Sequence, residues 1–310
     1  MKQANSIFSK NKNKLILLVL ALVSIFAFAA CGSDDEESGG NGFNTGRQIT
    51  VVSREDGSGT RGAFVEITGV EVTDADGNSR DMTTVDAEIA PGTSVVIGSV
   101  AGNEYAIGYI SLGSLNDTVT AIPINGVAAT AANVQSGAYP LFRTFYIAVR
   151  QERDALTQEF IEFMLSDQGQ EIVARNYTQV AASSPAYNQG SDLSGTIVVS
   201  GSTSVAPLME RFKEAFEDIH PGVTVEVHSA GTSAGIQAAI NGIAHIGMSS
   251  RALRPAELES VEAIAIAYDG LAVIINNANP LGAAGSGLTA EEIRQIFVGD
   301  ITRWNAILND

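Results

Sequence analysis

Apolar and polar positions follow two different periods between residues 47 and 310. Short runs rich in valine and isoleucine have the length and composition of buried β-strands. Between them, apolar residues recur every three or four positions, which is typical of helices packed on a sheet. This alternation predicts an α/β fold with largely parallel sheets. The predicted strands cover residues 49–53, 106–110, 145–149, 196–200, 224–228 and 271–275.

Four of the helices can be located from their apolar stripes. Thr289 and Glu292 have the spacing of a capping box, and an apolar stripe follows them. We expect all the stripes to lie in the protein core. About 265 residues follow the leader and its acidic extension, enough for two modest domains. The other three stripes are Leu208, Phe212, Phe216 and Ile219; Phe160, Phe163 and Met164; and Ile236, Ile240 and Ile243.

The first 46 residues differ in composition from the rest. Four lysines precede an apolar run over residues 15–30, which is short for a membrane span and has the layout of a secretory signal. The run ends in Phe28-Ala-Ala before Cys31, the single cysteine, and this resembles a bacterial lipobox. We therefore predict a lipoprotein signal peptide over 1–30, with Cys31 lipidated and the protein anchored on the extracytoplasmic face of the cell membrane. The alternative is an ordinary signal peptide followed by a stray cysteine.

Residues 31–46 are acidic and rich in glycine, a composition that predicts a flexible tether. The leader contains no acidic residue, so the remaining chain has 14 basic residues against 35 acidic ones. This balance argues against binding to nucleic acid or to anionic lipid surfaces. Any bound anion must therefore be held by local donors. Neither a metal nor an organic cofactor is indicated, and we expect a monomer.

Three predicted strands each end in a turn of glycine, serine and threonine that opens a helix. N–H groups in the first turn of a helix lack intrahelical acceptors, and the helix dipole favours negative charge there. Arg54, close to the first of these turns, adds a cation with several donors. The combination predicts a site for a tetrahedral oxyanion. The turns lie at residues 57–60, 201–207 and 229–235, and a further group of hydroxyls lies at 247–253.

These segments resemble the phosphate-binding proteins of bacterial ABC-type phosphate importers. The resemblance rests on VVSREDGSGTRGAF, NEYAIGYISLGSL, SGAYPLFRTFYIAV, GSTSVAP, SAGTSAGIQAAINGIAHIGMSSR, YDGLAVIINNANP and LTAEEIRQIFVGDITRW. It implies a two-lobed periplasmic-binding-protein fold with a hinge. It also implies inorganic phosphate clamped between the lobes and passed to a membrane permease, without enzymatic chemistry.

The order of the segments differs from that of the family. There the GSTSVAP half comes first, whereas here residues 47–190 precede it, so we predict a circular permutation. One lobe would be continuous over 142–268, and the other would combine 47–141 with 269–310. The ends at Arg47 and Asp310 should then lie close together. The alternative is a fragment of a tandem array or a truncated gene.

The resemblance also implies roles for individual residues. Arg54 would bind two phosphate oxygens, and Asp56 would orient Arg54. Ser250 stands where studied members have an aspartate that accepts the phosphate proton, so rejection of sulfate is in doubt. Asp269 is a candidate replacement, or else an acid at a strand end satisfied by backbone N–H groups. The remaining anion contacts would be Ser58, Gly59 and Thr60 from one lobe, and Thr203, Ser204 and Thr232 from the other.

Arg61 and Arg251 are expected to form ion pairs at the rim. Closure of the lobes would occur about crossings near residues 137–144 and 268–275. Three alternatives to phosphate transport stay open: binding of sulfate, molybdate or a phosphonate; a surface or signalling module that has lost binding; and hydrolysis of phosphate esters. Hydrolysis is disfavoured because the three histidines have no triad or metal spacing around Ser58.

Overall fold

The computed structural model describes residues 42–188, 193–285 and 287–308. The predicted signal peptide, Cys31 and most of the tether lie outside these residues. The predicted tether extends too far, because Phe43 already belongs to the folded unit and its ring lies 4.9 Å from that of Tyr105. Within the described parts of the chain, no helix has both the length and the apolar content needed to cross a membrane.

One mixed sheet of nine strands organises this unit, in the order β4-β1-β5-β11-β7-β10-β8-β9, with β6 also paired to β11. A separate hairpin consists of β2 and β3. The bounds are β1 Thr50–Arg54, β2 Glu71–Thr73, β3 Ser79–Asp81, β4 Glu88–Ala90, β5 Ala106–Ser111, β6 Val119–Ala121, β7 Phe142–Val149, β8 Ser194–Gly201, β9 Gly222–Ser229, β10 Ile246–Ser249 and β11 Glu262–Asn276.

The expectation of largely parallel strands is wrong for the middle of the sheet. Parallel pairing occurs at its two ends, where β1 joins β4 and β5, and where β8 joins β9 and β10. In the middle, β11 pairs antiparallel with β5, β6 and β7, and β7 pairs antiparallel with β10. All six predicted strands are present; the strands that were not predicted are β2, β3, β4, β6 and β10.

The helices cover both ends of this sheet. Their bounds are α2 Gly59–Thr68, α3 Thr93–Gly102, α4 Ala131–Gln135, α5 Ala155–Leu165, α6 Asp167–Ala174, α7 Ala206–Ile219, α8 Thr232–Ile240, α9 Pro255–Leu258, α10 Pro280–Ala284 and α11 Ala290–Val298. The predicted capping box is confirmed, since Thr289 and Glu292 bond each other's backbone N–H at the start of α11. Ile243 was wrongly assigned to the core, because it lies beyond the end of α8 and is 73% exposed.

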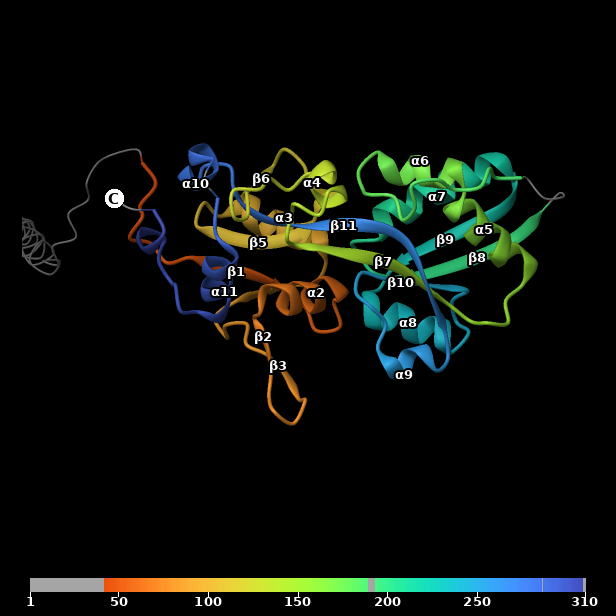
Figure 1. Ribbon diagram of the computed structural model, residues 1–310, viewed down its shortest axis with the longest axis horizontal. Coiled ribbons are helices and arrows are strands. Elements are labelled where there is room, and N and C mark those ends of the chain that lie inside the picture. The colour runs from red at the N-terminus through yellow and green to blue at the C-terminus, as the bar shows by residue number, and fades with distance from the viewer. Residues whose placement is uncertain (1–41, 189–192, 286, 309–310) are drawn as a thin grey trace, which may run out of the picture. The chain divides into compact units, whose positions relative to one another are not determined.

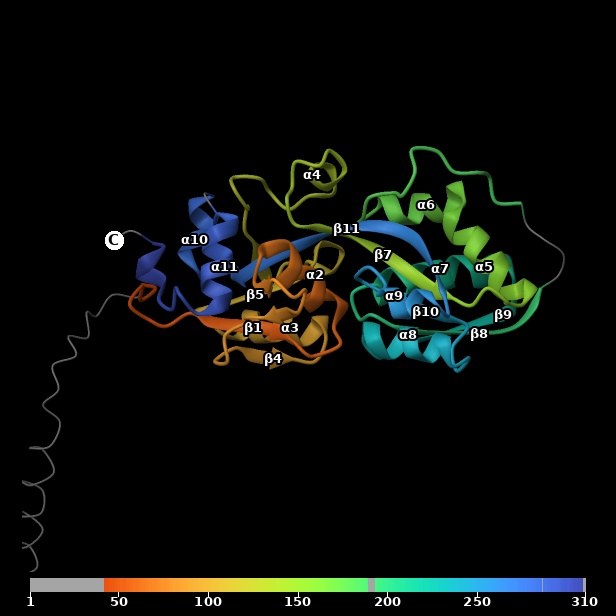
Figure 2. The ribbon, with the colours of Figure 1, turned by 60° about the horizontal axis from the view of Figure 1, so that its bottom comes forward.

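Two lobes share the long strands β7 and β11. One large apolar core combines side chains from β7, β8, β9, α5 and α7, and two others combine side chains from β1, β5, α2, α3 and α11. Figures 1 and 2 show β11 running from one group of elements into the other, with β7 beside it. The lobe boundaries predicted at 141/142 and 268/269 stay a prediction.

The two described ends of the chain lie side by side in both views (Figures 1 and 2). The Ile49 N–H donates to the Thr302 carbonyl at 2.8 Å, and the Asn305 N–H donates to the Thr45 carbonyl at 2.7 Å. Arg47 accepts a bond from the Trp304 N–H at 3.3 Å. Asp310, the other residue of the predicted closure, lies outside the described residues.

Candidate anion-binding site

Hydroxyl groups from the predicted helix starts converge between the two lobes. Thr60 Oγ1, at the start of α2, lies 2.7 Å from Ser204 Oγ, just before α7. Thr232 Oγ1, at the start of α8, lies 3.3 Å from Ser250 Oγ. We call this group the hydroxyl cluster; it consists of Thr60, Thr93, Ser202, Thr203, Ser204, Thr232 and Ser250. All except Thr203 are buried, so water competes little for their hydrogen bonds.

Arg54 borders this hydroxyl cluster at the end of β1. Its side chain is 2% exposed, and its Nη2 donates to Thr203 Oγ1 at 3.0 Å. Nη1 donates to Thr93 Oγ1 at 3.5 Å, and Thr93 Oγ1 in turn lies 3.3 Å from Ser204 Oγ. A guanidinium and several neutral donors are therefore gathered in one buried place, which is the chemistry that an oxyanion requires.

Glu55, and not Asp56, orients Arg54. The Glu55 carboxylate accepts from Arg54 Nε at 2.7 Å and from Nη2 at 2.8 Å. The prediction for Asp56 is wrong, because its side chain is 99% exposed and pairs with Arg61 at 3.1 Å. Partial burial opposes ionisation of Glu55, but the hydrogen bonds and charge of Arg54 outweigh it and lower the pKa of Glu55.

Sequence reasoning missed a second buried arginine. Arg143 on β7 donates through Nε and Nη2 to one oxygen of Asp269, its register partner on β11, at 3.1 and 3.0 Å. The other Asp269 oxygen accepts from Ser111 at 2.8 Å. Arg143 also donates to the backbone carbonyl of Ser250 at 3.3 Å, which links the pair to the hydroxyl cluster.

This pair is almost fully buried. Burial raises the pKa of Asp269 and lowers that of Arg143, although each charge favours ionisation of the other. Among the described residues, the side-chain partners of the Asp269 carboxylate are Arg143 and Ser111, and none belongs to the hydroxyl cluster. A lone arginine within an apolar strand, opposite a strand that carries an acid, is the sequence signal that could have identified the pair.

Two further members of the hydroxyl cluster were missed. Ser202 donates to Ser250 Oγ at 2.9 Å and accepts from the Ser204 N–H at 3.2 Å. Thr93 begins α3 directly after Pro91-Gly92, so it belongs to a fourth helix start. A Pro-Gly turn followed by Thr and Ser was the available signal for Thr93.

Gly59 permits the close approach of the two lobes. A Cβ atom there would lie 2.5 Å from Thr232 Oγ1 and 2.7 Å from Ser250 Oγ, both from the opposite lobe. Only glycine fits this spacing without displacing those hydroxyls. Ser58 acts as the N-cap of α2, where its Oγ accepts from the Arg61 N–H at 3.3 Å.

The arginines expected at the rim form ion pairs as predicted. Arg61 pairs with Asp81 at 2.7 Å, in addition to Asp56. Arg251 pairs with Glu257 at 2.8 Å. Within the described parts of the chain, neither guanidinium donates to a side chain of the hydroxyl cluster.

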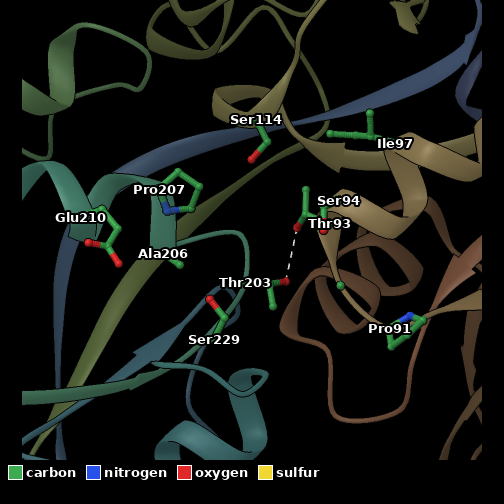
Figure 3. A pocket seen from close by; sticks show the side chains of 11 residues that line it. Pro91, Thr93, Ser94, Ile97, Ser114, Thr203, Ala206, Pro207, Glu210 and Ser229 are labelled. Carbon is green, nitrogen blue, oxygen red and sulfur yellow. Dashed lines mark hydrogen bonds between the residues drawn. The ribbon is translucent and has the colours of Figure 1, made fainter. Parts of the chain in front are cut away.

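A cavity of about 580 Å³ adjoins the hydroxyl cluster at Thr93 and Thr203 (Figure 3). One wall comes from residues 91–94, Ile97 and Ser114, and the facing wall from Thr203, Ala206, Pro207, Glu210 and Ser229. The Thr93–Thr203 contact of 3.3 Å forms the border between the cavity and the cluster.

The structure contains no group of acids, histidines and cysteines placed to hold a metal ion among the residues it describes. Each histidine also has a partner away from Ser58. His220 bonds Tyr187 at 2.6 Å, and His245 accepts from the Val198 N–H at 2.9 Å. His228 lies 3.7 Å from Glu226. This arrangement provides no base for a serine nucleophile.

Known proteins match most of this chain. A family model described as a PBP superfamily domain matches residues 21–168 and 180–310. The phosphate-binding protein PstS 2 of Streptococcus pneumoniae TIGR4 is 43% identical over 91% of this chain and 94% of its own length. The protein of the same name from Streptococcus agalactiae 2603 V/R is 40% identical over 89% and 92%.

A solved structure agrees with these matches. It is described as a phosphate-binding protein of a phosphate ABC transporter from Streptococcus pneumoniae TIGR4, and it is 43% identical to this chain. The superposition covers 84% of this chain and all of that one, with a TM-score of 0.66. The predicted two-lobed α/β fold is thereby confirmed. The chain belongs to the PBP superfamily and, within it, to the phosphate-binding proteins of ABC-type phosphate transporters.

Proposed function

We propose that this protein binds inorganic phosphate at Arg54 and the hydroxyl cluster and delivers it to the permease of an ABC-type phosphate importer. The observation that carries the proposal is the buried guanidinium of Arg54, bonded to hydroxyls of two helix starts. The names of the relatives support the same ligand and the same transport system. The protein has no chemistry of its own and acts as a binding protein.

Phosphate would replace the hydrogen bonds that the hydroxyls now make with one another. Thr60 of one lobe and Ser204 of the other lie close enough to contact one anion together. Binding would therefore favour the closed arrangement of the lobes, about the crossings near 137–144 and 268–275. Exclusion of water strengthens each of these hydrogen bonds.

Discrimination between phosphate and sulfate depends on an acceptor for the phosphate proton. The oxygens of Asp269 are already engaged by Arg143 and Ser111, so Asp269 is poorly placed to act as that acceptor. Ser250 lies within the hydroxyl cluster, but a hydroxyl can donate as well as accept. We therefore expect modest discrimination, and sulfate, molybdate and phosphonates stay candidate ligands. Competition titrations among these anions rank them directly.

Calorimetric titration of the Arg54→Lys and Arg54→Met variants with phosphate tests the proposal. Loss of a buried charge partner costs about 2–5 kcal/mol, so we expect Arg54→Met to weaken binding by at least about 30-fold. Arg54→Lys retains the charge but lacks the forked donors, and should lie between the wild type and Arg54→Met. Arg294→Met, on the surface of α11, is the matched control and should bind as the wild type does.

Three outcomes would contradict this assignment. Unchanged affinity in folded Arg54→Met would place the site elsewhere. A cooperatively folded wild type that binds none of the anions would instead favour a surface module without binding. A chain that lacks a cooperative unfolding transition would favour a fragment.

We further propose that Cys31 carries a lipid that anchors the protein on the extracytoplasmic face of the membrane. Support comes only from the sequence: lysines, an apolar run and a lipobox-like end before the single cysteine. Labelled fatty acid should be incorporated by the wild type and lost in Cys31→Ser. Labelling of both proteins, or of neither, would contradict the anchor.

We also infer that the two halves of the chain are in permuted order. The contacts of Arg47 and Thr45 with residues 304 and 305 support this, because the described ends could be joined by a short linker. A chain rebuilt as 191–310, a linker and 47–190 should fold and bind phosphate with unchanged affinity. Failure to fold would contradict the inference.

A further inference from the structure

The cavity beside Arg54 exceeds the space that an inorganic phosphate requires. Its volume of about 580 Å³ lies within the range of roughly 300–1,000 Å³ typical of pockets for small organic ligands. Thr93 and Thr203 both bond Arg54 and both line this cavity. A tetrahedral anion held by Arg54 would therefore lie at the cavity wall, where one of its oxygens could carry a substituent.

The walls of the cavity offer both hydrogen bonds and apolar contact. Ser114 Oγ is buried and has no hydrogen-bond partner among the described residues. In Figure 3 its side chain points towards the space between Pro207 and Thr203. Ile97 and Pro207, on opposite walls, supply carbon atoms. Rotation of the Ser114 side chain would bring its unpartnered hydroxyl to a polar group that enters this space.

Glu210 is the charged residue among those that line the cavity. Its side chain is 47% exposed, and its carboxylate lies 3.7 Å from Lys213 Nζ. A carboxylate in this position favours a substituent that donates hydrogen bonds or carries positive charge, and disfavours a second anionic group.

We propose that the cavity accepts the organic substituent of a phosphomonoester or phosphonate whose phosphorus oxyanion is bound at Arg54. The substituent is short and ends in an ammonium or hydroxyl group that reaches Ser114 or Glu210. This proposal rests on the phosphate site proposed above, and it widens the ligand class from the free anion to its small organic derivatives.

Calorimetric titration of the wild type with inorganic phosphate, 2-aminoethyl phosphate and propyl phosphate tests the proposal. We expect 2-aminoethyl phosphate to bind within about tenfold of inorganic phosphate, a difference of about 1.4 kcal/mol at most. Propyl phosphate, which lacks the ammonium group, should bind more weakly than 2-aminoethyl phosphate. Ser114→Ala should weaken only the 2-aminoethyl ester, by about 2- to 10-fold, because it removes one hydrogen bond.

Ser94→Trp provides a steric test, since Ser94 lines the cavity at the exposed start of α3. The bulky ring should abolish binding of the ester and leave binding of inorganic phosphate within about twofold. Val95→Trp is the matched control: Val95 is also exposed on α3 but does not line the cavity. It should bind both ligands as the wild type does.

The outcomes separate the two proposals. A wild type that binds phosphate but binds the ester more than about 100-fold more weakly would overturn the proposed cavity function. Equal ester binding by Ser94→Trp and wild type would overturn it as well. A wild type that binds neither ligand would instead overturn the phosphate site itself.

Discussion

Arg54 shows how a single buried charge is held ready for an anion. Arg54 donates to Glu55 through Nε and Nη2, and it also donates through Nη1 to Thr93 and through Nη2 to Thr203, one threonine from each lobe. The neighbouring carboxylate compensates the guanidinium within the protein, so the cation remains tolerable inside a low-dielectric site. Asp56, one residue further, points to solvent and plays no part in this balance.

Replacement of Glu55 and of Asp56 should therefore differ in effect. Glu55→Gln loses charge-assisted hydrogen bonds to Arg54, and we expect a loss of about 1.5–3 kcal/mol in the free energy of unfolding at pH 7. Asp56→Asn should change it by less than about 0.5 kcal/mol, because Asp56 is exposed. Urea unfolding of both variants measures the difference.

The pH dependence follows from the lowered pKa of Glu55. A depressed carboxyl pKa contributes stability above the unfolded-state value of 4.5, and that contribution disappears as pH falls through the lower folded-state pKa. The difference in the free energy of unfolding between wild type and Glu55→Gln should thus become smaller below pH 4.5. If this difference is the same at pH 7 and below pH 4.5, the stabilising role of ionised Glu55 is contradicted.

At the scale of the elements, the starts of four helices point to the same place, the hydroxyl cluster. Helices α2, α3, α7 and α8 each place a threonine or serine hydroxyl into the hydroxyl cluster. Two of them belong to each lobe, so neither lobe holds a complete site. Helix starts supply N–H groups and partial positive charge without adding a full charge.

Gly59→Ala should separate closure from folding. Alanine suits a helix better than glycine by roughly 0.5–1 kcal/mol, so the melting temperature should not fall. Its Cβ would nevertheless collide with Thr232 and Ser250 of the other lobe, and we expect weaker phosphate binding by about tenfold or more. Gly62→Ala on the same helix is the control, since its Cβ would meet Arg251 at an ordinary 3.5 Å. Equal affinities of the two variants would contradict this steric role.

For the whole molecule, β7 and β11 join the lobes and carry the Arg143–Asp269 pair between them. A buried pair of this kind tolerates removal of both charges better than removal of one. The bond from Arg143 to the Ser250 carbonyl also connects the strand crossing with the hydroxyl cluster. The pair therefore couples the region of the proposed hinge to the site.

Arg143→Met should lower the free energy of unfolding by about 3–5 kcal/mol, because it leaves the Asp269 carboxylate buried and unpaired. The double variant Arg143→Met, Asp269→Leu should recover most of that loss. Chemical denaturation of both variants measures the loss and its recovery. A loss below about 1 kcal/mol in the single variant would mean that the pair is not important for the fold.

Sequence alone determined the features that depend on neighbouring residues. Strand and helix periodicity, the capping box of Thr289 and the helix starts that contain Thr60, Ser204 and Thr232 were all predictable, because each arises within a few residues. The family motifs added the role of Arg54 as a phosphate ligand and the two-lobed fold. They did not identify the partner of Arg54, because adjacent acids on a strand end point in different directions.

Only the tertiary structure decided which distant groups meet. Arg54 contacts Thr203 across 149 residues of sequence, and Arg143 pairs with Asp269 across 126. The cavity likewise forms where Ser114 and Ile97 face Pro207 across the lobes. Such contacts depend on strand register and on how two packed lobes approach each other. Local sequence patterns carry neither, because both result from the packing of the whole chain.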